Sequence, residues 1–504
     1  MGVLAEPGNG FESGKQVEDG SIEGPLEEID PVAEAKLVRK LDVHIIPVVM
    51  LLYLFSFLDR RVIPHVLRSS NRVNIGNARL YGLEEDLGLN STQWQTAISI
   101  LFVTYILSEV PSNLVLKKLT PSRWIAFITV SWAIVATLTG VVQNFAGLIV
   151  CRLFLGAVEG GLFPGLAVYL TFFYTKRELA LRIGYLFVSA ALAGACGGLL
   201  AFAIGHMDGV AGERGWRWIL IIEGLPTFVL GIATWWILPD EPATTYFLND
   251  QEKKLAVARL KRQTGYTISA QEFHWQDVRN GAKDWKIWAF SFAQFGCDTM
   301  LYGFSTFLPT IIKGIQPHAS TALVQVYTIP CYAVGAITYL IVARLSDYQQ
   351  KRGVYAVALG VVAIVGYAML MSNSSAAVHY AGCFLVAMGL YVNVGLPLAW
   401  LPTNNPRYGK RTIATGLQLS LGNCAGIMSS FLYPAKEGPR FIRGHAVTLA
   451  MVAFASAVYA FMWFYYSRVN ARRARGDEDH KIQGMSDQEI KELGDDSPRF
   501  VYTI

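Results

Sequence analysis

Long apolar runs separated by short polar connections dominate the pattern of this chain. Each run is about 20 residues long, which matches the ~30 Å hydrocarbon thickness of a bilayer. A β-barrel is not predicted, because its strands would alternate polar and apolar residues over segments of about ten residues. The runs predict twelve transmembrane helices, at residues 43–58, 94–116, 124–142, 148–173, 183–204, 218–238, 285–312, 322–343, 354–371, 380–401, 413–433 and 446–466.

The runs fall into two groups of six, and this grouping predicts the domain organisation. A stretch rich in Glu, Gly and Pro at 1–40 is typical of a disordered cytoplasmic N-terminal tail. Six helices form an N-terminal half at 41–238, and a polar cytoplasmic linker follows at 239–284. Six more form a C-terminal half at 285–467, before a charged cytoplasmic C-terminal tail at 468–504. The predicted fold class is all-α: a polytopic membrane protein with two six-helix halves.

The composition excludes several classes of protein. Hydrophobic residues make up 53% of the chain and charged residues 16%, against roughly 25% charged residues in a soluble domain. A soluble enzyme, a disordered regulator and a disulfide-stapled secreted module are therefore excluded. The net charge of +5 does not indicate a nucleic-acid partner, because the basic residues lie in short loops. The six cysteines lie in predicted helices without a CxxC pair, so we interpret them as structural thiols and expect no metal site and no cofactor.

The placement of Lys and Arg sets the predicted orientation. Basic residues cluster in alternate connections, on the same side as the linker and the C-terminal tail, at 36–40, 117–123, 176–182, 344–352 and 407–411. Because basic loops face the cytoplasm, both termini and the linker are expected there. The sequons at Asn90 and Asn373 fall on the opposite side, as glycosylation requires.

Few ionisable residues interrupt the predicted helices, and each is a candidate for function because charge in hydrocarbon is costly. Arg152 and Glu159 stand seven residues apart in the fourth helix, which is two turns, or roughly 10.5 Å, along one face. That separation favours two depths of one cavity over a direct ion pair. The other candidates are Asp59 and Arg60 at the end of helix 1, Glu109 in helix 2, Glu223 in helix 6 and Asp298 in helix 7.

Structural roles are alternatives for these residues. Asp59 and Arg60 could anchor helix 1 at the interface, and Arg152 could extend its guanidinium to the headgroups. Glu109 and Glu223 lie near helix ends, which favours structural roles. Glu159 is flanked by glycines that permit close helix packing, but close packing does not explain a carboxylate.

Several of these segments resemble one known family. Residues 152–165 (RLFLGAVEGGLFPG) are similar to the helix 4 signature of the anion:cation symporters of the major facilitator superfamily. The end of helix 1 at 53–60 (YLFSFLDR) and the segment at 74–87 resemble further family motifs. Similar matches occur at 216–224, 302–309 and 344–347, and the resemblance covers about residues 35–470. In detail the chain looks like the fungal branch, which includes allantoate, nicotinate, biotin and pantothenate permeases.

One departure from the family pattern affects the end of helix 1. Residues 61–72 separate Asp59-Arg60 from the segment that begins at Asn74, where the family has one residue. They add three arginines and Pro64, and proline ends or kinks a helix. A gene-model error, a splice variant and a genuine insertion are the alternatives. The loop between helices 2 and 3 also lacks the acidic residue of the wider superfamily, as is usual in this branch.

The resemblance implies a major facilitator fold and proton-coupled symport of a small organic anion, such as nicotinate, allantoate or a carboxylate vitamin. An arginine suits such a substrate because its planar guanidinium binds a carboxylate with two parallel hydrogen bonds. A partly desolvated acid can carry a proton at working pH, and Asp59 and Glu159 match the coupling positions of the family. The expected substrate-binding residues are Arg60, Arg152, Tyr105, Tyr302, Asn393 and Gln418, and Asn423 could also orient the ligand.

The expected partners are the organic anion, protons as the coupling ion and the lipid bilayer, with no nucleic acid and with the chain as a monomer. The expected location is the plasma membrane. Two alternatives stay open, an exporter of a secondary metabolite and a non-transporting nutrient receptor. An enzyme is not predicted, because HExxH, GxSxG and GxxxxGK[ST] motifs do not occur in the chain.

Overall fold

The computed structural model describes residues 30–61, 83–116, 118–205, 207–262, 272–319, 321–429, 432–433, 437–438 and 440–504. Within these ranges all the regular structure is helical, which confirms the predicted fold class. The N-terminal half contains α1 (Pro31–Arg61), α3 (Leu83–Asp86), α4 (Ser91–Leu116), α5 (Pro121–Thr139), α6 (Phe145–Glu159), α7 (Leu162–Phe173), α8 (Leu179–Gly205) and α9 (Gly215–Ile237). The C-terminal half contains α13 (Trp285–Ile315), α14 (Thr321–Gln349), α15 (Gly353–Met371), α16 (Ala376–Thr403), α17 (Tyr408–Ser429) and α18 (Ile442–Ala474).

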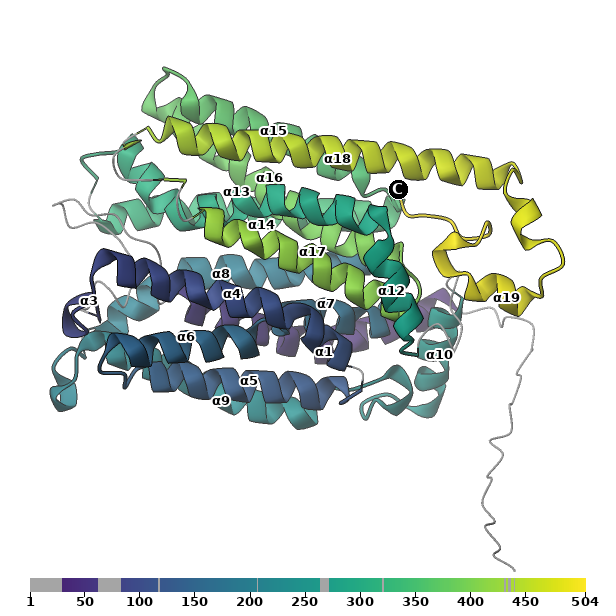
Figure 1. The fold of residues 1–504 in the computed structure, drawn as a ribbon, viewed down its shortest axis with the longest axis horizontal. Coiled ribbons are helices and arrows are strands. Elements are labelled where there is room, and N and C mark those ends of the chain that lie inside the picture. Colours follow the sequence, from purple (N-terminus) through teal and green to yellow (C-terminus); the bar gives the residue numbers. More distant parts are fainter. Residues whose placement is uncertain are drawn as a thin grey trace, which may run out of the picture.

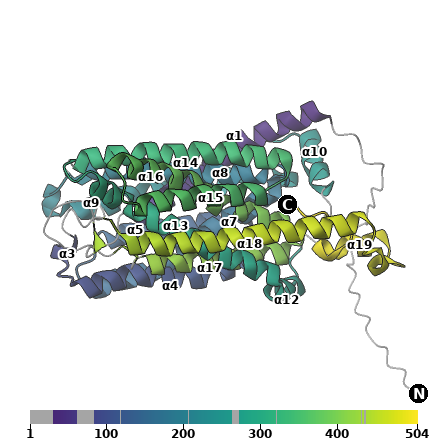
Figure 2. The ribbon, with the colours of Figure 1, turned by 90° about the horizontal axis from the view of Figure 1, so that it is seen from above.

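The long helices run along a common axis, with the N-terminal half in the lower part of Figure 1 and the C-terminal half above it. Two helices of the linker, α10 (Asp250–Lys261) and α12 (Trp275–Lys283), lie at one end of the bundle with α19 (Asp487–Glu492) of the tail, and α3 lies at the other (Figures 1 and 2). We call these the linker end and the α3 end. The linker and the C-terminal tail therefore share one side, as the sequence predicts.

Length and composition make most of these helices suitable for crossing a membrane. Among the described residues, nine segments are long and apolar enough to span a bilayer, with α6 and α7 counted as one. The remaining long helices of the bundle are α8, α13 and α17, and polar residues such as Gln294, Asp298 and Gln418 interrupt the last two. Large apolar side chains face outward along the spans, for example Leu107 and Trp236, as lipid contact requires.

The first helix begins earlier than the hydrophobic run indicates. Residues 31–40, which the sequence analysis assigns to the disordered tail, are helical. Asp30 caps this start, because its carboxylate accepts hydrogen bonds from the backbone N–H groups of Val32 at 2.9 Å and Ala33 at 3.3 Å. Pro31 occupies the first helical position, where a missing N–H costs nothing. Hydropathy reports the membrane-crossing part of a helix, so it does not locate this capped extension.

The two halves meet along a long seam. α4 packs against α17, and α8 packs against α14 and α16. Gly416 of α17 lies close to α4, since an added Cβ atom would lie 3.0 Å from a methyl carbon of Val110. The seam therefore brings helices 2 and 5 of the first half against helices 8, 10 and 11 of the second, and it places side chains from both halves around the bundle centre.

Candidate functional site

The fourth span is broken near its middle, and Glu159 lies at the break. α6 ends at Glu159 and α7 begins at Leu162, so Gly160 and Gly161 separate two helical segments that the sequence analysis treats as one helix. A Cβ atom added at Gly160 would lie 2.4 Å from the backbone oxygen of Tyr105 on α4. Glycine therefore lets α4 pack directly against the break, as small residues do at membrane-helix interfaces.

The Glu159 carboxylate is held by the first helix. Glu159 is 1% exposed, and its Oε1 accepts a hydrogen bond from Ser56 Oγ of α1 at 2.8 Å. Ser56 lies three residues before Asp59, so the contact joins the last turns of α1 to the break in span 4. A hydroxyl donates to a carboxyl oxygen in either protonation state. Glu159 can therefore gain or lose a proton without losing this anchor.

Arg152 lies two turns before Glu159 on α6 and is 3% exposed. Burial inside the bundle favours an interior role over a guanidinium extended to the headgroups. Asp59 and Arg60 belong to the last turn of α1, but their side chains lie outside the described part of the chain, as do residues 62–82. The roles assigned to Asp59, Arg60 and the 61–72 segment therefore stay predictions.

We expect Arg152→Lys to raise the apparent KM for substrate about tenfold, equivalent to ~1.4 kcal/mol. Lysine keeps the charge but loses the planar fork that binds a carboxylate with two hydrogen bonds. Concentration-dependent uptake of labelled substrate measures the change, and Arg177→Lys, at an exposed position, serves as the control. An unchanged KM in Arg152→Lys would assign Arg152 a structural role.

Deletion of residues 61–72 is expected to leave transport at or above the level of the full chain. The deletion restores the spacing that the resemblance predicts, because Asp59-Arg60 then runs through Val73 into Asn74. Uptake by cells that express either form measures the effect, with surface labelling to check localisation. Loss of transport on deletion, with the full chain active and correctly localised, would make the segment a working part of the protein.

A layer of aromatic rings lies on the linker side of Glu159. It draws on both halves, with members on α1, α7, α8, α14 and α16, and all of them are buried. Successive ring centroids lie 4.8 to 6.3 Å apart. The rings belong to Tyr53, Phe163, Phe187, Tyr339 and Tyr391. Because Phe163 follows Glu159 by four residues in the direction of the linker end, the layer separates the carboxylate from that end.

Polar contacts tie the halves together at the linker end itself. The Asp347 carboxylate of α14 accepts hydrogen bonds from the backbone N–H groups of Ala180 at 3.2 Å and Leu181 at 2.8 Å, in the first turn of α8. Arg352 Nη2 donates to Asp347 Oδ1 at 3.2 Å and to the backbone oxygen of Lys176 at 2.6 Å. A carboxylate at a helix N-terminus is stabilised by the helix dipole. These contacts hold the linker end closed in this structure.

A second polar cluster crosses the seam. Asn423 of α17 donates from Nδ2 to Glu109 Oε1 of α4 at 2.5 Å, and the Tyr302 hydroxyl of α13 donates to Asn423 Oδ1. The ring of Tyr302 also meets Phe102 of α4 edge to face, with centroids 5.7 Å apart. The structure thus places Tyr302 and Asn423 at the interface of the halves and pairs them with Glu109, which the sequence analysis left out of the site.

A third cluster lies within the C-terminal half. Gln418 Nε2 donates to Gln294 Oε1 at 3.1 Å, and Gln294 Nε2 donates to Asp298 Oδ1 at 2.8 Å. The exposed fractions are 0% for both glutamines and 3% for Asp298. The sequence contains one feature that indicates this cluster. Gln294, Asp298 and Tyr302 are spaced four residues apart, which places all three on one face of α13.

The other predicted site residues lie elsewhere. Asn393 donates to the Gly389 backbone oxygen of its own helix at 3.0 Å and lies beside Gly360 of α15. Tyr105 is 2% exposed on α4, level with the break in span 4. The structure does not bring Asn393 into any of the three clusters. Its role in binding substrate and that of Tyr105 stay predictions.

The sequence and the fold can be compared with known proteins. Residues 49–430 match the family model of the Major Facilitator Superfamily. An uncharacterized transporter of Schizosaccharomyces pombe is 38% identical, over 93% of this chain and 90% of its own. The high-affinity nicotinic acid transporter of Saccharomyces cerevisiae is 30% identical, over 93% of this chain and 85% of its own.

The fold is similar to that of a solved superfamily structure. The proton:xylose symporter XylE bound to 6-bromo-6-deoxy-D-glucose matches 85% of this chain and 96% of its own, with a TM-score of 0.61 and 12% identity. At that identity the likeness shows the fold alone. The family model matches most of the chain, and the relatives are transporters. Together these matches identify a multi-pass membrane transporter and not an enzyme. The chain belongs to the Major Facilitator Superfamily.

Proposed function

We propose that this transporter carries a small organic anion together with protons, in the same direction across the plasma membrane. The observation that carries the proposal is the arrangement of span 4. Arg152 and Glu159 are both buried on one helix, two turns apart, and a hydroxyl of α1 holds the acid at the break between α6 and α7. A buried guanidinium can bind a carboxylate ligand, and a buried carboxyl group can bind and release a proton.

The arrangement of the halves supports alternating access to such a site. Glu159 is separated from the linker end by the aromatic layer, whose rings come from both halves. Rocking the halves apart at that end would part Phe187 of α8 from Tyr339 and Tyr391 of the second half and expose the carboxyl to the other side. In transporters built from two repeats, such rocking moves substrate past a fixed site near the bilayer centre.

The substrate class rests on the guanidinium and on one relative. A relative of 30% identity is named as a high-affinity nicotinic acid transporter, and nicotinate is a small aromatic carboxylate. We propose a substrate of this kind, with a ring or ureido group beside one carboxylate, and a monomeric transporter. Aromatic side chains near the seam, such as Tyr302, could stack on such a ring.

Competition for uptake tests the substrate class. Cells that express the protein are given labelled nicotinate, allantoate, biotin or pantothenate, and each uptake is challenged with the matching uncharged amide or ester. We expect one carboxylate to be taken up and its uncharged counterpart to compete at least tenfold more weakly. Equal competition by both forms would contradict an anion site.

The same measurement separates two other functions. An exporter would lower the content of preloaded substrate without promoting uptake. A nutrient receptor would bind substrate in membranes without moving it. Both outcomes would overturn symport and leave the superfamily assignment unchanged.

A further inference from the structure

Asp298 is a buried acid that the proposed mechanism does not yet use. It lies near the middle of α13 and is 3% exposed. The hydrogen bond from Gln294 Nε2 holds its Oδ1 at 2.8 Å. Among the described residues, no Lys, Arg or His nitrogen lies within ion-pair distance of this carboxylate. A charge at this depth without a cation is costly, and a neutral carboxylic acid avoids that cost.

The hydrogen-bond donors around Asp298 can bond to its carboxyl group in both the protonated and the ionised form. The amides of Gln418 and Gln294 donate in sequence toward Asp298, and Gln418 Oε1 has no hydrogen-bond partner in the described structure. The nearby titratable groups are the Cys297 thiol of the same helix and the Tyr459 hydroxyl of α18. Thiols and phenols ordinarily ionise only above neutral pH. Among the described residues, no cation within ion-pair distance therefore holds Asp298 in its ionised form.

The neighbourhood of Asp298 also leads to the seam. Gly422 of α17 lies directly against the acid, since an added Cβ atom would lie 2.2 Å from Asp298 Oδ2. The next residue, Asn423, donates to Glu109 of the N-terminal half. A change of charge and hydration at Asp298 would act on the turn of α17 that holds the two halves together.

We propose that Asp298 is a second proton-binding site, located in the C-terminal half, with Gln294 and Gln418 as its positioning residues. The proton binds a carboxyl oxygen of Asp298 and leaves from it, and no other bond forms or breaks. Glu159 binds a proton in the N-terminal half, and Asp298 binds a proton in the C-terminal half. The inference rests on the proposed function, because it assumes that protons move with substrate.

Counting protons tests the proposal. The purified protein is reconstituted in liposomes, and substrate uptake and pH change are recorded together with a labelled carboxylate and a pH dye. We expect Asp298→Asn to lower the number of protons per substrate by about one relative to the wild type, with KM changed less than threefold. Thr299→Val is the matched control, because the Thr299 hydroxyl bonds only to the backbone of its own helix at 2.9 Å.

The outcomes are distinguishable. If the wild-type protein transports substrate without moving protons, the proposed function fails. If the wild type moves protons and Asp298→Asn keeps the same ratio and the same pH dependence, the second site is wrong. Gln418→Leu keeps the acid and offers a second test, since losing the amide that donates to Gln294 should shift the pH profile of transport without changing the ratio. An unchanged profile in a folded Gln418→Leu protein would remove the positioning role.

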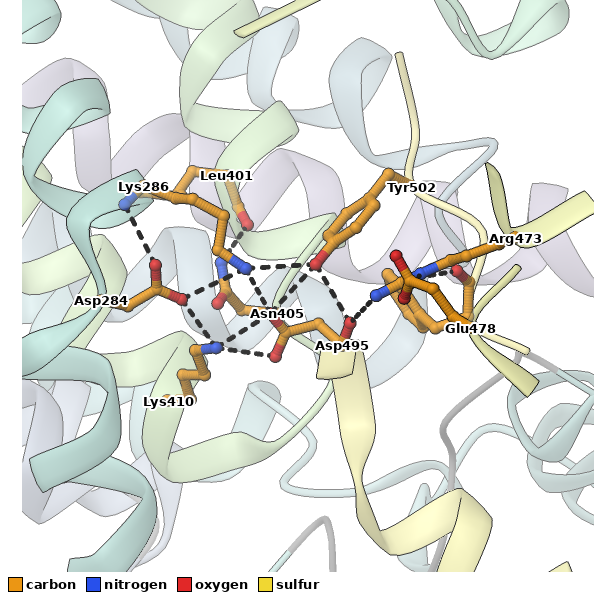
Figure 3. A network of polar contacts seen from close by, with 10 residues as sticks. Asp284, Lys286, Leu401, Asn405, Lys410, Arg473, Glu478, Asp495 and Tyr502 are labelled. Carbon is orange, nitrogen blue, oxygen red and sulfur yellow. Dashed lines mark hydrogen bonds and ion pairs between the residues drawn. The ribbon is translucent and has the colours of Figure 1, made fainter. Parts of the chain in front are cut away.

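An independent set of contacts lies at the linker end, where residues 477–504 fold back onto the bundle (Figure 1). We call these residues the C-terminal segment, and Figure 3 shows its polar contacts with the helix ends. Asp495 is 2% exposed, and its carboxylate lies 2.8 Å from both Lys286 Nζ and Lys410 Nζ, at the starts of α13 and α17. Burial opposes ionisation, but Lys286 and Lys410 hold the pKa of Asp495 below its ordinary value. The ion pairs therefore persist at neutral pH, and because the pKa of Asp495 is lowered they are lost only in acid, as the pH falls below the ordinary pKa of an Asp carboxyl group.

The last residues of the segment bind further helices of the C-terminal half. The ring of Tyr502 stacks on Tyr466 of α18, with centroids 4.5 Å apart. Trp400 Nε1 of α16 donates to the backbone oxygen of Thr503 at 2.7 Å. The backbone N–H of Arg352 donates to the backbone oxygen of Ile504. The segment is thus fixed to the C-terminal half at several helix ends.

One residue of the segment reaches the N-terminal half. Phe500 is fully buried, and Lys176 Nζ, from the connection between α7 and α8, lies 4.0 Å from the centroid of its ring. Lys176 is also joined to the C-terminal half through its backbone oxygen, which accepts a hydrogen bond from Arg352. Opening the linker end would separate Lys176 from Phe500. Burial lowers the pKa of Lys176 to about 7, so the contact is a cation–ring pair near and below neutral pH, where Lys176 is protonated, and in that form it stabilises the closed arrangement.

We propose that the C-terminal segment is a latch that holds the linker end closed and slows its opening. Spin labels at Arg123 of α5 and Arg468 of α18, two exposed positions near this end, report the distance between the halves. We expect Phe500→Leu to increase the population with the longer distance at least threefold, and Val501→Ala, at an exposed neighbour, to leave it unchanged.

A second variant removes the same contact from the other half. Lys176→Gln leaves the C-terminal segment unaltered, so it keeps the test usable if Phe500→Leu does not fold. We expect the same shift toward the longer distance. Distance distributions identical to that of the wild type in the folded variants would overturn the latch.

Discussion

Glu159→Gln should abolish the accumulation of substrate against a gradient while substrate exchange across the membrane stays measurable. Glutamine preserves the shape of the side chain and can still accept the hydrogen bond from Ser56 Oγ, which Glu159 Oε1 accepts at 2.8 Å. It cannot bind and release a proton. Transport then loses its driving force but keeps its binding site, so the substrate equilibrates without being concentrated.

Two assays separate these effects. Net uptake into energised cells or vesicles measures accumulation, and exchange of labelled for unlabelled substrate measures the remaining movement. Ser56→Ala is the matched control, because it removes the hydroxyl and keeps the acid, and we expect it to weaken accumulation without abolishing it. A Gln variant that still concentrates substrate would show that Glu159 is structural.

Gly160→Ala should destabilise the protein by about 1–3 kcal/mol, the usual cost of overpacking, and at the upper end of that range. The added Cβ atom would lie 2.3 Å from Ser108 Oγ and 2.4 Å from the backbone oxygen of Tyr105. The backbone oxygen belongs to α4 and cannot move aside as a flexible side chain can. The break in span 4 would be forced away from α4, and Glu159 would move with it.

Gly165→Ala is a closely matched control for this prediction. It makes the same substitution five residues later, but its Cβ atom would find its nearest neighbour, a methyl carbon of Leu116, at 3.8 Å, an ordinary contact distance. Stability is measured as the fraction of the protein that stays monodisperse after heating, determined by size-exclusion chromatography. Equal stability of the two variants would contradict the packing described at the break.

The membrane-crossing pattern could be predicted because lipid imposes it directly on the sequence. A span must be apolar over the thickness of the bilayer, so hydropathy predicts twelve spans, and nine segments among the described residues are long and apolar enough to cross a membrane. It could not locate the capped start of α1 at Pro31, because Asp30 stabilises that start through local hydrogen bonds. Nor did it reveal the break after Glu159, which depends on how closely α4 approaches Gly160.

The clusters of polar residues were less predictable, for a physical reason. Helix spacing places Gln294, Asp298 and Tyr302 on one face of α13, but it does not say which helix that face meets. The contacts of Tyr302 with Asn423, and of Asn423 with Glu109, depend on the crossing of α4, α13 and α17. The sequence interpretation placed Glu109 near a helix end and favoured a structural role, but Glu109 lies seven residues before the end of α4 and accepts a hydrogen bond from Asn423 of the other half.

Proton-driven accumulation by the purified protein tests the account most directly. The protein is reconstituted in liposomes whose outside is made acidic relative to the inside, and the labelled carboxylate selected by the competition assay is supplied outside. The account predicts that substrate concentrates inside above its external level, that an uncoupler releases it, and that the Glu159→Gln protein does not concentrate it. Proton-coupled symport through the span 4 site would be contradicted by accumulation that does not depend on the pH gradient and is unaffected by the uncoupler. Accumulation that persists in the Glu159→Gln protein would contradict it as well.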